Sequence, residues 1–211
     1  MSFLLTCIVF YFIGSFPTAY LLVKYKYGKN LANEGSGNIG ARNTLDVTHS
    51  KSDGVTVLII DFLKGLLPVI WFLNYSGFDP EMVIIPSLFI IAGHNYSVWL
   101  KFRGGRGLAT GAGIMAAVNF ILVIIWLIFY FPAQKITKNV HLACVAALIL
   151  LPMPVILMQE FLLKFLNPAL KEAGADYRFM FSFTASLCII ILLKHIEPLI
   201  EYFQNKKTNK T

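Results

Sequence analysis

Long apolar segments alternate with short polar segments along the whole chain. The first apolar segment, residues 2–23, reads "SFLLTCIVFYFIGSFPTAYLLV". No basic residue precedes it, which favours a retained helix over a cleaved secretion signal. Each apolar segment approaches the roughly 20 residues that a helix needs to cross about 30 Å of hydrocarbon. The later segments lie at about Val55–Tyr75, Met82–Leu100, Leu108–Pro132, Val140–Phe165 and Phe179–Ile200.

This alternation predicts an all-α integral membrane protein. We expect residues 1–203 to form a single polytopic membrane domain and residues 204–211 to form a basic cytoplasmic tail. The composition agrees, because 57% of the 211 residues are hydrophobic and only 14% are charged, whereas about a quarter of a soluble domain is charged. Cys7, Cys144 and Cys188 all lie inside apolar segments, which favours buried packing over disulfide bonds or a metal site.

The segment Leu108–Pro132 permits two topologies. It forms either one long helix or two short helices hinged near Val118–Phe120, where Asn119 is a weak helix former. With two helices the chain has seven spans, an outside N-terminus and a cytoplasmic C-terminus. Its basic residues outside the spans then divide fourteen inside to three outside, against eleven to six for one long helix. The positive-inside rule therefore favours seven transmembrane helices.

The net charge of +7 also fits this topology. In a membrane protein a basic excess typically reflects positive cytoplasmic loops and anionic lipid head groups, so we expect no nucleic-acid partner. The topology places the polar loops around Gly37, Gly104 and Lys138 on the cytoplasmic face.

The first of these loops, Asn33–Asp46, reads "NEGSGNIGARNTLD". Gly35, Gly37 and Gly40 match the spacing of the dinucleotide fingerprint, but a membrane helix and a basic linker precede them where that fingerprint requires a strand. Closely spaced glycines also let backbone N–H groups converge on an anion. On this segment alone, an anion-binding loop and a flexible connector are equally compatible with the sequence.

The second polar loop, Phe102–Gly113, reads "FRGGRGLATGAG" and leads into a helix that we expect to start near Leu108. Arg103 and Arg106 flank two of its glycines. Arginine makes bidentate contacts to phosphate, and a helix N-terminus adds partial positive charge. The alternative is a pair of arginines that only extend to the membrane surface. Two cationic glycine-rich loops on one face favour phosphate binding.

Other ionisable residues lie near the cytoplasmic ends of the apolar segments. Asp61 and Lys64 are one helical turn apart and can pair on one face, as a functional site or as a structural clamp. His94 lies near the end of the third predicted span and His195 near the end of the last, and a hydrogen-bonded structural role is the alternative for each. The sequence contains no nucleophile triad and no metal-ligand spacing, so we expect catalysis by positioning and charge stabilisation, with no metal ion or cofactor.

Four motifs occur in a fixed order between Gly14 and Gly113: "GSFPTAYLL", "GSGNIGARNTL", "DFLKG" and "GHNYSVWLKFRGGRGLATGAG". This ordered set resembles the acyl-phosphate:glycerol-3-phosphate acyltransferases of the PlsY type, with this chain as a divergent member. The resemblance implies a seven-helix enzyme of the cell (inner or plasma) membrane. Such an enzyme moves a fatty acyl group from acyl phosphate to the 1-hydroxyl of glycerol-3-phosphate, giving lysophosphatidic acid and phosphate in phospholipid biosynthesis.

The resemblance also implies partners and site residues. The partners are acyl phosphate, glycerol-3-phosphate and membrane lipid, and we expect a monomer. Catalytic roles fall to Ser36, His94 and His195. Substrate binding falls to the other polar and glycine positions of the site: Asn38, Arg42, Asn43, Lys64, Asn95, Arg103, Gly104, Gly105, Arg106, Gly107 and Thr110.

Three positions depart from the family pattern. Asp46 stands where an arginine is expected, His141 where a serine is expected, and Pro198 where an asparagine is expected. If Ala41–Asp46 is helical, Arg42 and Asp46 share one face. We hypothesise that Arg42 takes over the phosphate contact and that Asp46 orients it.

Two other functions are compatible with the sequence. A catalytically altered homologue would bind phosphate compounds without turnover, and a transporter would move a phosphorylated small molecule. The chain shows no clear repeat of broken helices in its two halves, which argues against the transporter.

Overall fold

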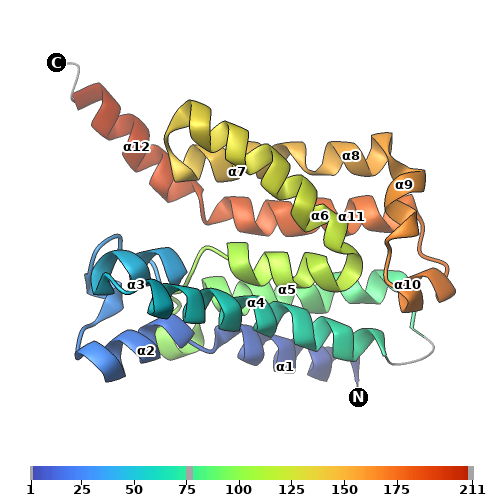
Figure 1. Ribbon diagram of the computed structural model, residues 1–211. Helices are drawn as coiled ribbons and strands as arrows, with labels where there is room; N and C mark the ends of the chain where they lie inside the picture. Colours follow the sequence, from blue (N-terminus) through green and yellow to red (C-terminus); the bar gives the residue numbers. More distant parts are fainter. Residues whose placement is uncertain (1, 75–77, 209–211) are drawn as a thin grey trace.

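The chain folds into a bundle of helices joined by loops, shown in Figure 1 for a computed structural model that describes residues 2–74 and 78–208. Within these residues the extended pairing is an isolated bridge between Ser97 and Arg103, which confirms the all-α class. Three short turns of 3₁₀ helix are η1 (Leu31–Asn33), η2 (Pro80–Val83) and η3 (Val98–Leu100). The α-helices are α1 (Phe3–Ser15), α2 (Thr18–Tyr27), α3 (Ala41–Thr48), α4 (Lys51–Leu73), α5 (Ile84–Asn95), α6 (Leu108–Thr137), α7 (Val140–Leu150), α8 (Pro152–Leu157), α9 (Gln159–Lys164), α10 (Pro168–Glu172), α11 (Tyr177–Leu193) and α12 (Ile196–Thr208).

Four helical segments of the described chain are long and apolar enough to cross a membrane. They are Phe3–Tyr27, Lys51–Leu73, Leu108–Thr137 and Val140–Leu157; α11 and α12 add a fifth if their 46° bend lies within one span. The count is below seven for two reasons: α5 has only 12 residues, and both halves of α6 count as one segment. The number of seven spans and the orientation of the termini remain predictions.

The predicted hinge in the fourth apolar segment is confirmed. Asn119 interrupts α6 with φ −159° and ψ 104°, and Figure 1 shows the chain turning back on itself within this helix. The Asn119 side chain stabilises the break, because it donates to the Leu162 carbonyl (2.8 Å) and accepts from the Ile121 N–H (3.1 Å). Asn167 donates to the carbonyl of Val118 that the break leaves free (2.8 Å).

Three apolar segments are less regular than predicted. The first is broken between α1 and α2, because Pro17 lacks an N–H and forces Phe16 into an extended conformation (ψ 117°). The third forms a regular helix only over α5, which ends at Asn95. The predicted span Val140–Phe165 is divided among α7, α8 and α9, since Pro152 opens α8 and Met158 separates α8 from α9.

Two pairs of glycines let neighbouring helices approach backbone to backbone. A Cβ at Gly14 of α1 would overlap the carbonyl oxygen of Ile90 in α5, and Gly93 of α5 lies equally close to α1. Gly65 of α4 and Gly113 of α6 form the same kind of contact. Small residues at such crossings are typical of membrane helices. They hold α1 closely against α5 and α4 closely against α6.

The remaining expectations concern the termini and the cysteines. The predicted end of the second span, Tyr75, and Lys210 of the basic tail lie outside the described residues. The predicted tail begins inside a helix, because α12 continues to Thr208. The three cysteines are buried and free, which confirms their packing role.

Candidate functional site

The polar loops meet at the end of the bundle formed by α2 and α3, away from the N-terminus (Figure 1). A cavity of about 310 Å³ lies there, and we call it the inner cavity. Segments far apart in the sequence form it: both glycine-rich loops, α3, α4, the end of α5, the start of α7 and His195 between α11 and α12. Its polar side chains are Ser36, Asn38, Arg42, Asp46, Asp61, His94, Arg106, His141 and His195.

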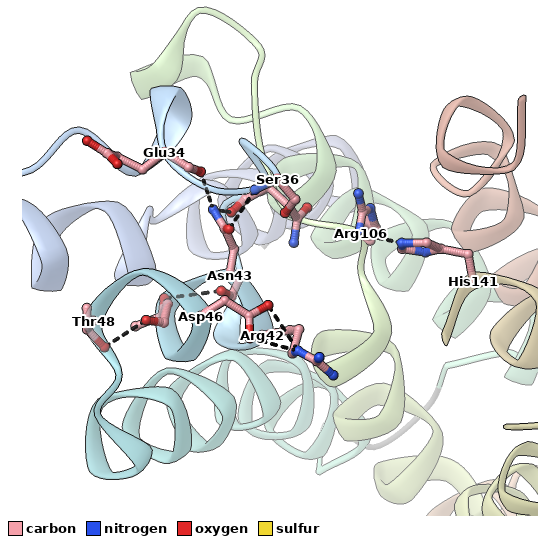
Figure 2. Close-up of polar contacts among 11 residues, drawn as sticks. Glu34, Ser36, Arg42, Asn43, Asp46, Thr48, Arg106 and His141 are labelled. Atoms are coloured by element: carbon pink, nitrogen blue, oxygen red, sulfur yellow. Dashed lines mark hydrogen bonds and ion pairs between the residues drawn. The ribbon is translucent and has the colours of Figure 1, made fainter. Parts of the chain in front are cut away.

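Asn43 holds the first glycine-rich loop together from inside (Figure 2). Its amide N–H groups donate to the carbonyl oxygens of Leu31 (3.4 Å), Glu34 (3.0 Å) and Asn38 (3.0 Å), and its oxygen accepts from the Ser36 N–H (2.9 Å). Only 2% of Asn43 is exposed. Asn43 therefore positions Ser36 and Asn38. A loop ordered in this way favours the anion-binding interpretation over the flexible connector.

The second glycine-rich loop packs directly on the end of α5. A Cβ at Gly104 would overlap the carbonyl oxygen of His94, and a Cβ at Gly105 would overlap its imidazole Nε2. The Gly105 N–H also donates to the His94 carbonyl (3.0 Å). Gly107 caps α6 with φ 79°, a conformation that suits glycine, and the helix begins at Leu108 as predicted. The loop thus sets the position of His94 as well as its own arginines.

Arg106 extends from this loop into the inner cavity. Its Nη1 lies 3.3 Å from Nε2 of His141 at the start of α7 (Figure 2), and the ring of His195 lies next to that of His141. Burial lowers the pKa of Arg106, while the carboxylates of Glu201 and Glu197 act in the opposite direction. An arginine nevertheless stays charged at physiological pH. The cavity therefore contains a partly desolvated cation, which suits a phosphate oxygen.

The predicted pairing of Asp61 with Lys64 is confirmed. The Lys64 Nζ lies 2.8 Å from Asp61 Oδ1 and donates to the Phe16 carbonyl (2.9 Å), and both side chains are more than nine-tenths buried. His94 Nδ1 lies 4.0 Å from the same carboxylate oxygen. Asp61 and His94 line the inner cavity, whereas Lys64 does not. Lys64 thus compensates the buried Asp61 charge from behind the cavity wall.

Arg42 and Asp46 form the predicted pair on α3. The Arg42 Nε lies 3.1 Å from Oδ1 and 3.0 Å from Oδ2 of Asp46 (Figure 2). Both side chains are at least half exposed, and both line the inner cavity. Within the described chain these contacts engage only the Nε of Arg42, so its terminal amino groups remain available to a ligand.

A second polar hollow, about 370 Å³, adjoins the inner cavity, and we call it the polar pocket. The two spaces share Ser36, Asn38 and Arg106 as lining residues. The polar pocket lies beside the second glycine-rich loop and the beginning of α12. Arg106 therefore stands between two polar spaces and can contact an anion in either.

The predicted site residues are distributed over these spaces. The inner cavity is lined by Ser36, Asn38, Arg42, His94, Arg106, Gly107 and His195. Arg103, Gly104 and Gly105 line the polar pocket alone. Asn43, Asn95 and Thr110 line neither space. The side-chain polar atoms of the last two are buried without a hydrogen-bond partner in the described chain.

Sequence reasoning missed several lining residues. Lys194, Glu197 and Glu201 all line the polar pocket. The two glutamates are four residues apart at the end of the last predicted span, a spacing that places them on one helical face. That spacing is the one feature of the sequence that could have indicated that the two glutamates face the same space. Leu58 also lines the inner cavity, and nothing in the sequence distinguishes it from other apolar residues of α4.

An apolar groove runs along α1 and α4. Two hollows of about 650 and 520 Å³ share Val9, Ile13, Ile60 and Lys64, and we call them together the α1–α4 groove. Apart from Lys64 the groove is lined by apolar and aromatic side chains. It therefore suits a hydrocarbon chain.

Comparison with known proteins gives consistent matches. Residues 4–205 match the family described as "Glycerol-3-phosphate acyltransferase". The chain is 45% identical to "Glycerol-3-phosphate acyltransferase 2" of Moorella thermoacetica over 128 residues, which are 59% of this chain and 64% of that relative, just under two thirds of its length. It is 34% identical to "Glycerol-3-phosphate acyltransferase" of Pelagibacter ubique over 162 residues, which are 76% of this chain and 82% of that protein.

The fold is similar to a solved structure as well. That structure is described as a crystal structure of "PlsY (YgiH), an integral membrane glycerol 3-phosphate acyltransferase", in the glycerol 3-phosphate form. The TM-score is 0.79 at 25% sequence identity, and the match covers 97% of this chain and 94% of the other.

Proposed function

Because this chain belongs to the glycerol-3-phosphate acyltransferase family, we propose that it is a membrane enzyme that transfers a fatty acyl group to the 1-hydroxyl of glycerol-3-phosphate. Acyl phosphate is the donor and lysophosphatidic acid is the product, as a step of phospholipid synthesis. The observation that carries the proposal is the junction of the inner cavity and the polar pocket at Ser36, Asn38 and Arg106. Two adjoining polar spaces can hold two phosphate groups around one cation.

The chemistry requires no nucleophile from the protein. The hydroxyl oxygen of the acceptor attacks the carbonyl carbon of the acyl phosphate and forms the ester bond. The bond between that carbon and the phosphate oxygen breaks, and phosphate leaves with the electron pair and takes up the hydroxyl proton. Positioning and charge stabilisation are then the main catalytic contributions. Arg106, which is partly buried, stabilises the charge on the departing phosphate.

We assign the acyl chain to the α1–α4 groove. The groove is apolar, and its one charged lining residue, Lys64, pairs with Asp61, which lines the inner cavity. A chain lying in the groove would therefore end close to the wall of the polar site. Burial of hydrocarbon at about 0.8 kcal/mol per methylene would hold the donor at the membrane boundary.

The topology belongs to the same proposal: seven spans in the cell (inner or plasma) membrane, with a monomer as the working unit. A cysteine introduced at Lys138 should be cytoplasmic and one introduced at Lys171 should be outside. Both positions are exposed and the native cysteines are buried. In intact cells a membrane-impermeant maleimide should label Lys171→Cys but not Lys138→Cys until the membrane is permeabilised. Labelling of Lys138→Cys from outside would contradict the seven-span count.

Arg42 should carry part of the acceptor binding. Arg42→Ala removes a cation that lines the inner cavity, so the KM for glycerol-3-phosphate should rise about tenfold, the equivalent of one charge-assisted contact. Asp46→Ala leaves that cation in place and should change the KM much less. Lys51→Ala, which removes an exposed cation outside the cavity lining, is the control. Equal effects of Arg42→Ala and Lys51→Ala would refute the role of Arg42.

The function is tested with purified protein in liposomes. Incubation with acyl phosphate and radiolabelled glycerol-3-phosphate should give labelled lysophosphatidic acid. Binding of glycerol-3-phosphate without this product would point to a catalytically altered homologue. Uptake of unmodified glycerol-3-phosphate into the liposomes would point to a transporter.

A further inference from the structure

Two imidazoles of the inner cavity have hydrogen-bonding roles that their neighbours determine. A guanidinium can only donate hydrogen bonds. The nitrogen that faces Arg106 at 3.3 Å, Nε2 of His141, must therefore accept. A neutral imidazole carries its hydrogen on the other nitrogen. His141 thus holds an N–H at Nδ1.

The second imidazole, His195, has its roles fixed by the helix α11 that it follows. Its Nδ1 lies 3.0 Å from the carbonyl oxygen of Ile191, four residues earlier. A carbonyl oxygen only accepts, so Nδ1 carries the hydrogen and Nε2 keeps a lone pair. His195 is fully buried, with no exposed surface.

Each imidazole therefore has one nitrogen left for a ligand. Nδ1 of His141 and Nε2 of His195 are both buried and have no hydrogen-bond partner in the described chain. Both residues line the inner cavity, and their ring centroids are 5.8 Å apart. Buried polar atoms without a partner are rare and costly. A donor and an acceptor this close together fit a substrate that presents an acceptor oxygen beside a hydroxyl.

We propose that His141 and His195 form a donor–acceptor pair that aligns the two reacting groups. Nε2 of His195 accepts a hydrogen bond from the 1-hydroxyl of the acceptor, and Nδ1–H of His141 donates one to an oxygen of the acyl phosphate. The bonds formed and broken are those of the proposed function, on which this inference rests; the hydroxyl proton, held at Nε2 of His195 as the oxygen attacks, passes from there to the departing phosphate. Arg106 binds the same acyl phosphate and also fixes the tautomer of His141.

This role distinguishes His141 from the serine that the family pattern places there. A serine hydroxyl rotates and can donate or accept, whereas the imidazole beside Arg106 presents only a donor to the cavity. His141 is therefore a positioning residue at a position where this chain departs from the family pattern, and its contribution depends on Arg106.

The tautomers can be measured without turnover. ¹⁵N NMR of the full protein labelled at histidine, in lipid, reports which ring nitrogen carries hydrogen, and single variants at the four histidines identify each signal. We expect the hydrogen on Nδ1 in both His141 and His195. Glycerol-3-phosphate, added without donor, should shift the Nε2 signal of His195. A hydrogen on Nε2 of His141, or an unchanged His195 signal at saturating acceptor, would overturn the proposal.

The kinetic test compares two replacements of His141. Gln retains an acceptor for Arg106 and an N–H donor, whereas Met retains the volume but has no donor. His141→Met should lower kcat about tenfold with a smaller change in KM, and His141→Gln should recover most of the loss. The control is His49→Asn, which replaces an exposed histidine at the C-terminal end of α3.

The outcomes separate this inference from the proposed function. Wild-type kcat in His141→Met, or equal losses in the Met and Gln variants, would reduce His141 to a packing residue. A wild-type protein that makes no lysophosphatidic acid would refute the proposed function. The NMR result would still decide whether the two imidazoles form the donor–acceptor pair.

Discussion

Replacing Arg106 with alanine should lower kcat/KM for acyl transfer by about ten- to a hundred-fold while the protein stays folded. A hydrogen bond from a charged group is worth roughly 1.5–3 kcal/mol, which corresponds to that range. Among the alanine replacements of single arginines, this one should cause one of the largest losses of kcat/KM, because Arg106 lines both the inner cavity and the polar pocket. Steady-state kinetics with the donor and the acceptor varied separately measure it.

Two further variants make the Arg106 result specific. Arg106→Lys keeps a point charge but not the planar fork of donors, so it should restore only part of the activity. Arg178→Ala removes an arginine whose side chain is 79% exposed at the start of α11 and should leave kcat/KM unchanged. If Arg106→Ala matched Arg178→Ala, the arginines of the glycine-rich loop would be no more than membrane-surface cations.

Gly105→Ala should reduce kcat about a hundred-fold although it adds a single methyl group. The new Cβ would overlap the Nε2 of His94, and that imidazole is buried against the loop. The ring must move, or the loop that carries Arg106 must lift. A displacement of about 1 Å at a reacting centre can cost a hundred-fold in rate. The free energy of unfolding should also fall, by about 1–3 kcal/mol.

The control for Gly105→Ala is Gly174→Ala. Gly174 has φ +81° and open space around it, so alanine strains the backbone there without touching the site. It should lower stability but not kcat. Thermal unfolding in detergent and kcat, measured for both variants, separate the two effects. A Gly105→Ala enzyme with normal kcat would show that the contact between His94 and the loop has no influence on catalysis.

Features that depend on neighbouring residues could be predicted from the sequence. The hinge at Asn119, the start of α6 at Leu108 and the pair of Asp61 with Lys64 all follow from local propensity or helical spacing. Each of these features depends on residues that lie within one or two helical turns of one another. Tertiary structure therefore had little opportunity to override them.

Features that depend on distant packing could not be predicted. The contact between Arg106 and His141 joins residues 35 apart in the sequence. Asn43 was predicted to bind substrate, yet its side-chain amide donates its hydrogen bonds to carbonyl oxygens of the loop itself. The early end of α5 at Asn95 coincides with the place where the glycine-rich loop packs on that residue. No periodic pattern along the chain carries that information.

The choice of acyl donor separates the proposed reaction from other acyl transfers to glycerol-3-phosphate. Purified protein in lipid nanodiscs would receive glycerol-3-phosphate with either acyl phosphate or the acyl-coenzyme A of the same chain length. We expect lysophosphatidic acid from acyl phosphate, with one inorganic phosphate released per product molecule, and little or none from the thioester. Product formed only from the thioester, or no product from either donor while glycerol-3-phosphate binds, would refute the proposed acyl transfer from acyl phosphate.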